Sequence, residues 1–284
     1  MKILIIGGTR FIGPLLVKKL YERGHNLTLF NREEKKGNYE DEIRVIKGDR
    51  NNGFDIADHF DVVIDTCAYE KAHVQAVLND LNFDFYLHIG TAASYKKTEI
   101  FPLKEADPIG EWKLWGNYNK GKVECEEVLK GCGKKFAVIR PTYILGPKNS
   151  IEREIFIYKK IKNKQPILLP GNGQALVKFV FVEDVVATIL RIINEKAEGC
   201  YNCSGDDIIT LKGLVEMMGE IVGIPPIIKN DPNAKGNNFN LEEFPFANEN
   251  FFCDNQKIKN LGIKFTPLVE GLKKDYDEYY KNII

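Results

Sequence analysis

Apolar residues follow two alternating patterns along the first half of the chain. Short continuous apolar runs are typical of strands buried on both faces of a sheet, and they occur at 2–8, 26–32, 43–49, 60–69, 83–94 and 135–146. Apolar residues spaced three or four positions apart predict helices, at 11–24, 71–81 and 121–133. Pro14 and Gly24 suit the first turn and the end of the first helix. Strands that alternate with helices predict an α/β fold with a doubly wound parallel sheet.

Beyond about residue 150 the alternation gives way to a mixed pattern. It predicts strands and a helix within 166–195, a helix at 209–223, a short strand at 224–229, an irregular stretch at 230–250 and a closing helix at 267–284. The segment YNCSG at 201–205 predicts a strand that returns to the first sheet. We therefore expect a doubly wound domain from 1–150 and 176–205, and a smaller mixed region from 151–175 and 206–284.

The first strand is followed by a glycine pattern, GGTRFIG, at residues 7–13. Gly7 would permit a tight bend, and Gly13 would let the helix pack closely on the strand. The helix N-terminus then offers free N–H groups and the positive end of a dipole to a pyrophosphate. A glycine turn between a buried strand and a helix is typical of dinucleotide-binding sites. We expect the doubly wound domain to bind the dinucleotide and the smaller region to bind the substrate.

Composition limits the classes of partner. Lys plus Arg and Asp plus Glu both number 40 among the 284 residues, so the net charge is zero, and no strong attraction to nucleic acid or to an anionic membrane surface is expected. No apolar run is long enough to span a bilayer, and the first residues lack the order of a signal peptide. Six cysteines suit a reducing compartment. We expect a cytoplasmic protein that acts on a small molecule. Whether it forms a homodimer is left undecided by the sequence.

Two of the cysteines, Cys200 and Cys203, are spaced like a redox or metal pair. No second pair stands at zinc-ribbon spacing, and the four histidines are scattered. The pattern of the segment also favours the end of a strand over the start of a helix. We therefore interpret the pair as two reduced thiols in or near a buried strand, and expect no metal site.

Seven segments resemble, in the same order, the motifs of the extended short-chain dehydrogenase/reductase family, the NAD(P)-dependent epimerases and dehydratases. They are GGTRFIG, KGDRNN, DVVIDTCAY, GTAAS, YNKGK, RPTYILGP and FVFVEDVV. Arg10 occupies the place of the middle glycine, and the third segment departs from the family's His-Leu-Ala-Ala after Asp65. The resemblance implies cofactor contacts at Gly7, Thr9, Arg10, Phe11, Ile12, Gly13, Asn31, Arg32, Asp49 and Lys122, with Asp49 at the adenine. It implies catalytic roles for Thr91, Tyr118 and Lys122.

The spacing of Tyr118 and Lys122 suits acid–base chemistry. Residues four apart share one face of a helix. A phenol with a pKa near 10 is a poor base at neutral pH, and a neighbouring ammonium lowers that pKa by stabilising the phenolate. Tyr118 could then exchange a proton with a substrate oxygen while hydride moves to or from the cofactor. The resemblance implies that Lys122 also holds the nicotinamide ribose, and the Thr91 hydroxyl could hydrogen-bond the substrate oxygen.

The choice of cofactor depends on the end of the second strand. A site that prefers NAD usually places an acid there to bind the ribose diol. This chain has Asn31 and Arg32 instead. Arg32, with Arg10, could pair with a 2′-phosphate, so the sequence favours NADP over NAD.

The substrate is less clearly indicated. The family's 4,6-dehydratases carry an Asp-Glu pair after the catalytic threonine, whereas Ala92 and Ala93 follow Thr91 here, which argues against a dehydratase. Nucleotide-sugar epimerases usually place an arginine seven residues before the Val-x-Asp aspartate. Val177 occupies that position, with Lys178 beside it on the opposite face of a strand. Lys178 and Tyr143, in the RPTYILGP segment, are the candidate substrate contacts.

The sequence favours an enzyme that moves hydride to or from a sugar-like or small carbonyl substrate. Two alternatives to this enzyme are also considered. The residues of several motifs also resemble those of a branch of the family that contains chloroplast stem-loop RNA-binding proteins and their bacterial relatives. The chain could therefore associate with RNA, or sense a cofactor without turnover. The zero net charge and the intact Tyr-x-x-x-Lys favour the enzyme.

Overall fold

The computed structural model describes residues 1–32, 43–234, 236 and 244–284, and the chain forms two compact units. The first unit comprises Met1–Pro141, Glu183–Cys203 and Asp254–Ile263. The second comprises Thr142–Val182, Ser204–Cys253 and Lys264–Ile284. The assignment of cofactor and substrate to separate regions stays a prediction.

A seven-stranded parallel sheet forms the centre of the first unit, in the order β10-β6-β5-β4-β1-β2-β3. Its strands are β1 Lys2–Ile6, β2 Asn26–Asn31, β3 Arg44–Lys47, β4 His59–Asp65, β5 Asn82–Ile89, β6 Phe136–Pro141 and β10 Gly199–Cys203. The order reverses direction at β1, which confirms the doubly wound fold. The predicted return of the chain through residues 201–205 is also confirmed, because β10 pairs with β6.

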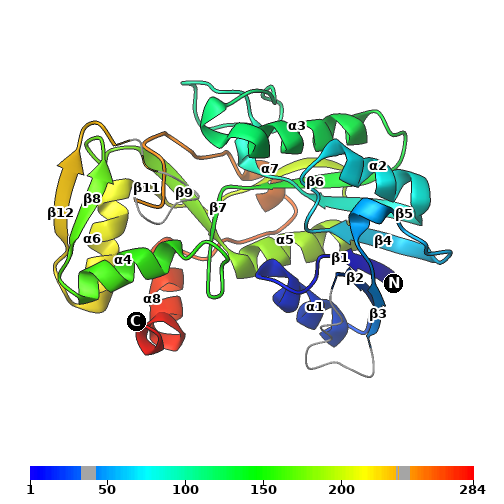
Figure 1. Cartoon of the computed structure of the whole chain (residues 1–284), viewed down its shortest axis with the longest axis horizontal. Helices are drawn as coiled ribbons and strands as arrows, with labels where there is room; N and C mark the ends of the chain where they lie inside the picture. The colour runs from blue at the N-terminus through cyan, green and yellow to red at the C-terminus, as the bar shows by residue number, and fades with distance from the viewer. Residues whose placement is uncertain (33–42, 235, 237–243) are drawn as a thin grey trace. The chain divides into compact units, whose positions relative to one another are not determined.

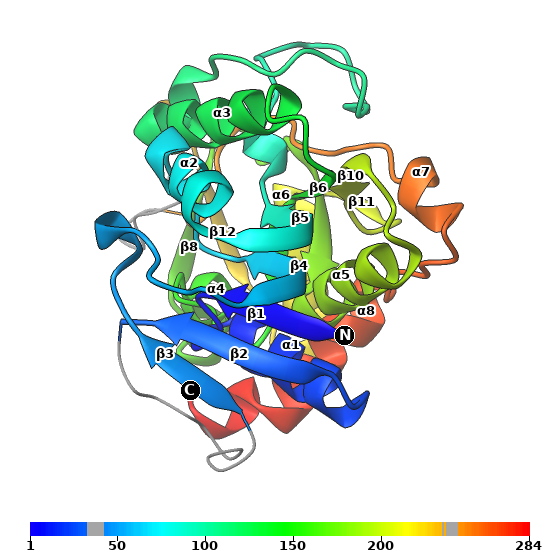
Figure 2. The same cartoon turned by 90° about the vertical axis from the view of Figure 1, so that its right-hand side faces the viewer.

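Helices cover both faces of this sheet: α2 and α3 lie on one face, and α1 and α5 on the other (Figures 1 and 2). The helical elements of this unit are α1 Ile12–Glu22, α2 Lys71–Asp80, α3 Gly116–Lys130, α5 Val182–Glu195 (within the unit from Glu183), α7 Gln256–Lys259, and the short 3-10 turns η1 Arg50–Asn52, η2 Ala92–Ser94 and η3 Lys113–Trp115. Gly24 has φ of 73° just beyond the end of α1, as the sequence predicts.

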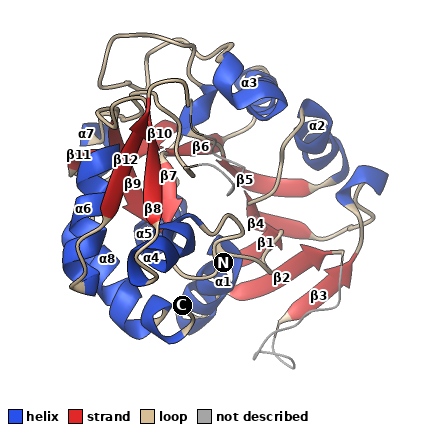
Figure 3. Cartoon of the chain, turned by 60° about the vertical axis from the view of Figure 1, so that its left-hand side comes forward, coloured by secondary structure: helices blue, strands red, loops and turns tan. Residues whose placement is uncertain are grey.

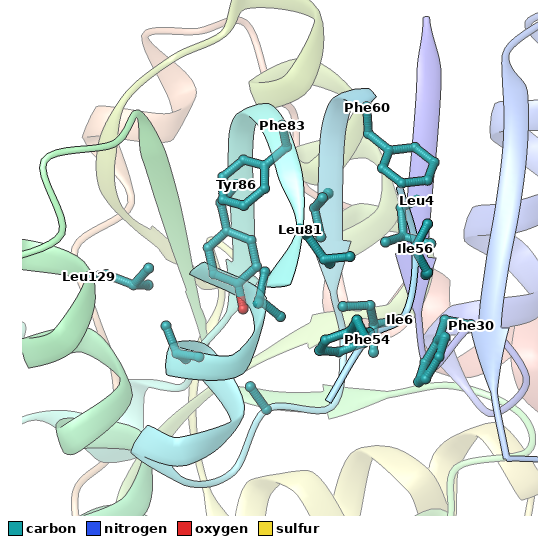
Figure 4. Close-up of a cluster of buried hydrophobic side chains, with 14 of the residues drawn as sticks. Leu4, Ile6, Phe30, Phe54, Ile56, Phe60, Leu81, Phe83, Tyr86 and Leu129 are labelled. Atoms are coloured by element: carbon teal, nitrogen blue, oxygen red, sulfur yellow. The ribbon is translucent and has the colours of Figure 1, made fainter. Parts of the chain in front are cut away.

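The face under α2 and α3 carries a large apolar core (Figure 4). Leu4 and Ile6 from β1, Val74 and Val77 from α2, and Leu129 from α3 all lie in it and are at most 1% exposed. Complete burial of an aliphatic side chain of this size contributes about 1.5–3 kcal/mol. This core fixes α3, which carries Tyr118 and Lys122, against the sheet.

Among its described residues, the second unit contains two small sheets and three α-helices, as Figure 3 illustrates. The three-stranded sheet has the order β11-β9-β7, and the two-stranded sheet pairs β12 with β8. The elements are β7 Tyr143–Leu145, α4 Arg153–Lys162, β8 Pro166–Pro170, β9 Leu176–Phe181, β11 Ile208–Thr210, α6 Leu211–Val222, β12 Ile227–Asp231, α8 Leu268–Glu278 and the 3-10 turn η4 Tyr280–Asn282.

Two predicted boundaries are wrong, and one helix was not predicted. The single strand expected at 135–146 is divided, because β6 ends at Pro141, which has no N–H to continue the ladder, and β7 joins the sheet of β9. The helix expected from residue 121 begins at Gly116, so Tyr118 lies in its first turn. Helix α4 was not predicted, although Ile157 and Ile161, four residues apart, form part of its buried face.

Gly13 shows how closely α1 packs on the turn before it. A Cβ atom at this position would lie 2.6 Å from the Gly8 carbonyl oxygen, closer than packed atoms tolerate. We expect Gly13→Ala to lower the free energy of unfolding by about 1–3 kcal/mol, the usual cost of overpacking. Urea unfolding measures the effect. In the control Gly131→Ala, the nearest heavy atom would lie at 3.8 Å, and an equal loss there would contradict the packing argument.

Candidate functional site

The glycine turn after β1 is bound to the end of β4. Gly7 has φ of 88°, and a Cβ atom there would lie 2.6 Å from the Thr66 hydroxyl and 2.7 Å from the Cys67 sulfur. The Thr66 hydroxyl lies 3.0 Å from the Ile6 carbonyl oxygen and 2.9 Å from that of Gly7. A side chain at Gly7 would therefore both strain the backbone and displace the segment that holds the turn.

Helix α1 begins directly after this turn. No side chain caps its first turn, and no acidic residue lies there. The predicted contacts within the turn differ in exposure: Thr9 and Phe11 are half-buried, Arg10 is exposed and Ile12 is buried. Ile12 thus packs inside, and only its backbone could face a phosphate. The uncapped N–H groups are suited to an anion.

The ends of β2 and β3 carry the other predicted cofactor contacts. Asn31 is 7% exposed, and neither its side-chain oxygen nor its nitrogen has a hydrogen-bond partner among the described residues. Arg32 is exposed. Asp49 is half-buried at the start of η1, and its carboxylate accepts a hydrogen bond from the Asn51 N–H at 3.0 Å. Within the described residues, the Asn31 amide is thus a buried polar group whose hydrogen-bonding capacity is unused.

Tyr118 and Lys122 lie together on α3, as their spacing predicts. Lys122 is 2% exposed, and its ammonium donates a hydrogen bond of 2.7 Å to the Ile89 carbonyl oxygen at the end of β5. The same nitrogen lies 6.0 Å from the centre of the half-buried Tyr118 ring and 4.8 Å from that of Tyr69. Thr91, two residues after Ile89, is buried, and its hydroxyl oxygen accepts from the Ala93 N–H at 3.1 Å.

Two residues of α3 fix the helix against these loops. The Asn119 amide donates to the Ala93 carbonyl oxygen at 2.6 Å and to that of Gly110 at 2.9 Å, which joins α3 to the turn after Thr91. Gly121 allows close approach on the other side, because a Cβ atom there would collide with the Tyr69 carbonyl oxygen. Any larger residue at position 121 would push Lys122 away from β5.

Burial determines the protonation of the groups under α3. It lowers the pKa of Lys122 to about 8, against the opposing effects of Cys125, Asp65 and Cys67. Burial and the Lys122 charge lower the pKa of His88 to about 3. Lys122 is therefore mostly cationic at pH 7, and His88, beneath it on β5, is neutral.

One buried charge pair was missed by sequence reasoning, which mentioned Asp65 only as the residue after which the segment departs from the family motif. Asp65 ends β4 and is fully buried, and Arg50 forms an ion pair with it at 2.8 Å. The signal in the sequence was a carboxylate that closes the apolar run VVI, where an unpaired charge would be too costly to bury.

The candidate substrate contacts lie in the second unit. Tyr143 on β7 is buried among aromatic rings, with centroids 5.9 Å from Phe179, 4.9 Å from Phe246 and 5.0 Å from Phe251, and burial raises the pKa of its phenol. Lys178 on β9 is half-buried, with its ammonium 3.5 Å from the Cys253 carbonyl oxygen. Their contact with substrate stays a prediction.

The cysteines form no disulfide. All six are free thiols, and Cys200 and Cys203 lie on β10, the first half-buried and the second buried. This agrees with their interpretation as reduced thiols in a strand. In the part of the chain that the structure describes, no helix is long and apolar enough to cross a membrane.

Comparison with known proteins identifies relatives along nearly the whole chain. Residues 3–82 and 71–204 match the model of the NAD dependent epimerase/dehydratase family. The chain is 32% identical to the chloroplast stem-loop binding protein of 41 kDa b from Arabidopsis thaliana, over 97% of this chain and 78% of the relative. It is 24% identical to UDP-glucuronic acid decarboxylase 1 of the same plant, over 82% of this chain and 61% of that protein.

Solved structures share the fold at low sequence identity. UDP-glucuronic acid 4-epimerase from Bacillus cereus, in complex with NAD, matches with a TM-score of 0.78 and 17% identity, over 100% of this chain and 99% of the other. dTDP-glucose 4,6-dehydratase from Bacillus anthracis, also in complex with NAD, matches with a TM-score of 0.78 and 17% identity, over 99% and 97%. Family model, sequence relative and fold agree: the chain belongs to the NAD-dependent epimerase/dehydratase family, of the extended short-chain dehydrogenase/reductase type.

Proposed function

We propose that this member of the family moves hydride between a nicotinamide cofactor and an alcohol or carbonyl of a sugar-like or small substrate, as an epimerase or a reductase. The observation that carries the proposal is the position of the Lys122 ammonium, which lies beside the Tyr118 ring and at the end of β5, two residues before Thr91. These are the three groups that proton transfer to a substrate oxygen requires.

The residues of the first unit fit a dinucleotide. Gly13 leaves no room for a side chain against Gly8, and Gly7 has the positive φ that a tight turn requires. The uncapped N-terminus of α1 offers N–H groups to a pyrophosphate. The Asn31 amide, which has no hydrogen-bond partner among the described residues, offers a donor and an acceptor to ribose hydroxyls. When bound, the nicotinamide supplies a hydride acceptor or donor.

The protein's own groups would then handle the proton and the developing charge. The Lys122 ammonium stabilises the Tyr118 phenolate, which takes the proton from a substrate alcohol or returns it in the reverse direction. The Thr91 hydroxyl donates a hydrogen bond to the same substrate oxygen. With its Nζ bound to the Ile89 carbonyl oxygen, Lys122 keeps two further N–H groups for the nicotinamide ribose.

Substrate class is proposed from the relatives and from one departure. Three of the matched enzymes are named for UDP-glucuronic acid or dTDP-glucose, so we propose a nucleotide sugar as the first candidate substrate. Ala92 and Ala93 follow Thr91 in η2, and both are buried. They supply no acid or base for elimination, so we propose epimerisation or reduction rather than dehydration.

We further propose that the cofactor is NADP rather than NAD. Arg32 is exposed directly after β2, so its cation is accessible to a 2′-phosphate. We expect Arg32→Asp to weaken NADPH binding by about tenfold or more relative to NADH, because it removes a cation and adds a repelling charge. Fluorescence titration of both reduced cofactors measures the ratio. Equal losses for the two cofactors would show that Arg32 does not contact the phosphate.

One relative supports a second candidate function. The relative that is 32% identical to this chain is named for stem-loop binding. A cytoplasmic location and a homodimer are also proposals. Nicotinamide absorbance with a panel of nucleotide sugars and ketones tests the enzyme, and a gel-shift assay with a stem-loop RNA at physiological salt tests the alternative. RNA binding without any change in nicotinamide absorbance would overturn the proposed enzyme.

A further inference from the structure

Arg50 and Asp65 form a buried, bidentate ion pair in the first unit. The two terminal nitrogens of Arg50 each donate to one carboxylate oxygen of Asp65, both at 2.8 Å. Arg50 is 9% exposed and Asp65 is fully buried. Burial alone would raise the pKa of Asp65, but the charge and hydrogen bonds of Arg50 outweigh it and hold the pKa at about 2. Both groups are therefore charged at neutral pH.

The pair joins four elements of the first unit. Arg50 is the first residue of η1, directly after Asp49, and it also donates to the His73 carbonyl oxygen of α2 at 3.0 Å. Asp65 accepts from the Tyr86 hydroxyl of β5 at 2.8 Å and from the Cys67 N–H at 3.1 Å. The pair thus connects the turn after β3 to α2, to the end of β4 and to β5.

From Asp65 the connection continues to the glycine turn. Thr66, the next residue, contacts the carbonyl oxygens of Ile6 and Gly7 through its hydroxyl. The Cys67 sulfur lies where a Cβ atom at Gly7 would intrude. The turn at Asp49 is expected to hold the adenine, and the turn at Gly7 is expected to hold the pyrophosphate. Arg50 and Asp65 link them in a chain of directional contacts.

The stability of the fold does not by itself account for such a buried ion pair. Desolvation of two charges offsets most of their attraction, and well-packed apolar residues in their place are often as stable or more stable. A bidentate guanidinium–carboxylate pair does fix geometry, because both hydrogen bonds must be satisfied at once.

We propose that Arg50 and Asp65 are positioning residues for the dinucleotide, which hold the adenine turn at Asp49 and the pyrophosphate turn at Gly7 in register with each other. This rests on the proposed function, since it requires that a dinucleotide binds there. Neither residue needs to touch the cofactor. Binding across two turns is sensitive to a displacement of one against the other.

The test separates affinity from stability. In the triple variant Arg50→Met/Asp65→Leu/Tyr86→Phe, the pair is replaced by apolar side chains, and no phenol is left without an acceptor. We expect the melting temperature to stay within about 3 °C of the wild type, while NADH or NADPH affinity, measured by fluorescence titration, falls about tenfold or more. The conservative variant Arg50→Lys, which keeps the charge but not the bidentate bond, should retain part of the affinity.

A second buried pair is the matched control. Arg140 and Glu126 form an ion pair at 2.5 Å that is as deeply buried, and their hydrogen bonds reach neither the Asp49 turn nor the Gly7 turn. Arg140→Met/Glu126→Leu should keep the cofactor affinity. If the wild type binds and the triple variant binds equally well, the inference is wrong. If the triple variant does not fold, Arg50→Lys decides: full affinity would overturn the inference. If the wild type binds no dinucleotide, the proposed function fails as well.

Discussion

Replacing Tyr118 with phenylalanine is expected to lower turnover by roughly 10²-fold or more, the usual scale for loss of a general acid–base. The ring keeps its place 6.3 Å from the Tyr69 ring and beside the Lys122 ammonium. Only the hydroxyl that exchanges the proton is removed. Cofactor affinity should stay nearly unchanged, because the proposed cofactor contacts are retained. Steady-state kinetics and a cofactor titration on the same preparation separate the two effects.

Tyr69 provides the matched control for this experiment. Its ring lies closer to the Lys122 ammonium than the Tyr118 ring does, at 4.8 Å against 6.0 Å. Tyr69→Phe also removes one phenol beside the same cation, but no role in proton transfer is proposed for it. Turnover that survives in Tyr118→Phe, or falls equally in both variants, would contradict the assignment of Tyr118.

The Lys122→Met variant should lose both turnover and cofactor affinity, each by roughly tenfold or more. Methionine fills the buried space but removes the cation beside Tyr118 and the N–H groups proposed for the ribose. The control Lys120→Met changes an exposed lysine of the same helix and should alter neither quantity. Loss of turnover with unchanged cofactor affinity would show that Lys122 stabilises the Tyr118 phenolate but does not hold the cofactor.

A pH dependence follows from the same residue. In the free protein Lys122 has a pKa of about 8, and a positive oxidised nicotinamide nearby would lower it further. Binding of the oxidised cofactor then releases a proton. Its affinity relative to the reduced cofactor should therefore rise as pH increases toward about 8, and level off above it. Calorimetric titrations across this range should show the rise in the wild type and not in Lys122→Met.

The sheet could be predicted from the sequence because its signals are local. Each parallel strand is an apolar run, and the turn at Gly7–Gly13 must open a helix wherever it follows a buried strand. The end of β6 was harder to predict. The apolar run passes from Phe136 to Leu145, but its last part pairs with β9, and pairing partners far along the chain leave no trace in local periodicity.

The candidate site was predictable where the spacing of residues along one helix brings reactive side chains together, as for Tyr118 and Lys122. Spacing could not show that Lys122 is buried or that Asn119 joins α3 to the turn after Thr91, because both depend on packing between separate segments. The Arg50–Asp65 pair shows the same limit. Each residue is visible alone, yet only the fold brings positions fifteen residues apart into contact.

Titration of reduced cofactor into the wild type, Tyr118→Phe and Lys122→Met tests the central claim most directly. The nicotinamide fluorescence of NADPH and NADH reports binding in each protein. The account predicts saturable binding of at least one cofactor to the wild type below millimolar concentration, nearly equal binding to Tyr118→Phe and clearly weaker binding to Lys122→Met. Absence of binding of either cofactor to the wild type at millimolar concentration would contradict it.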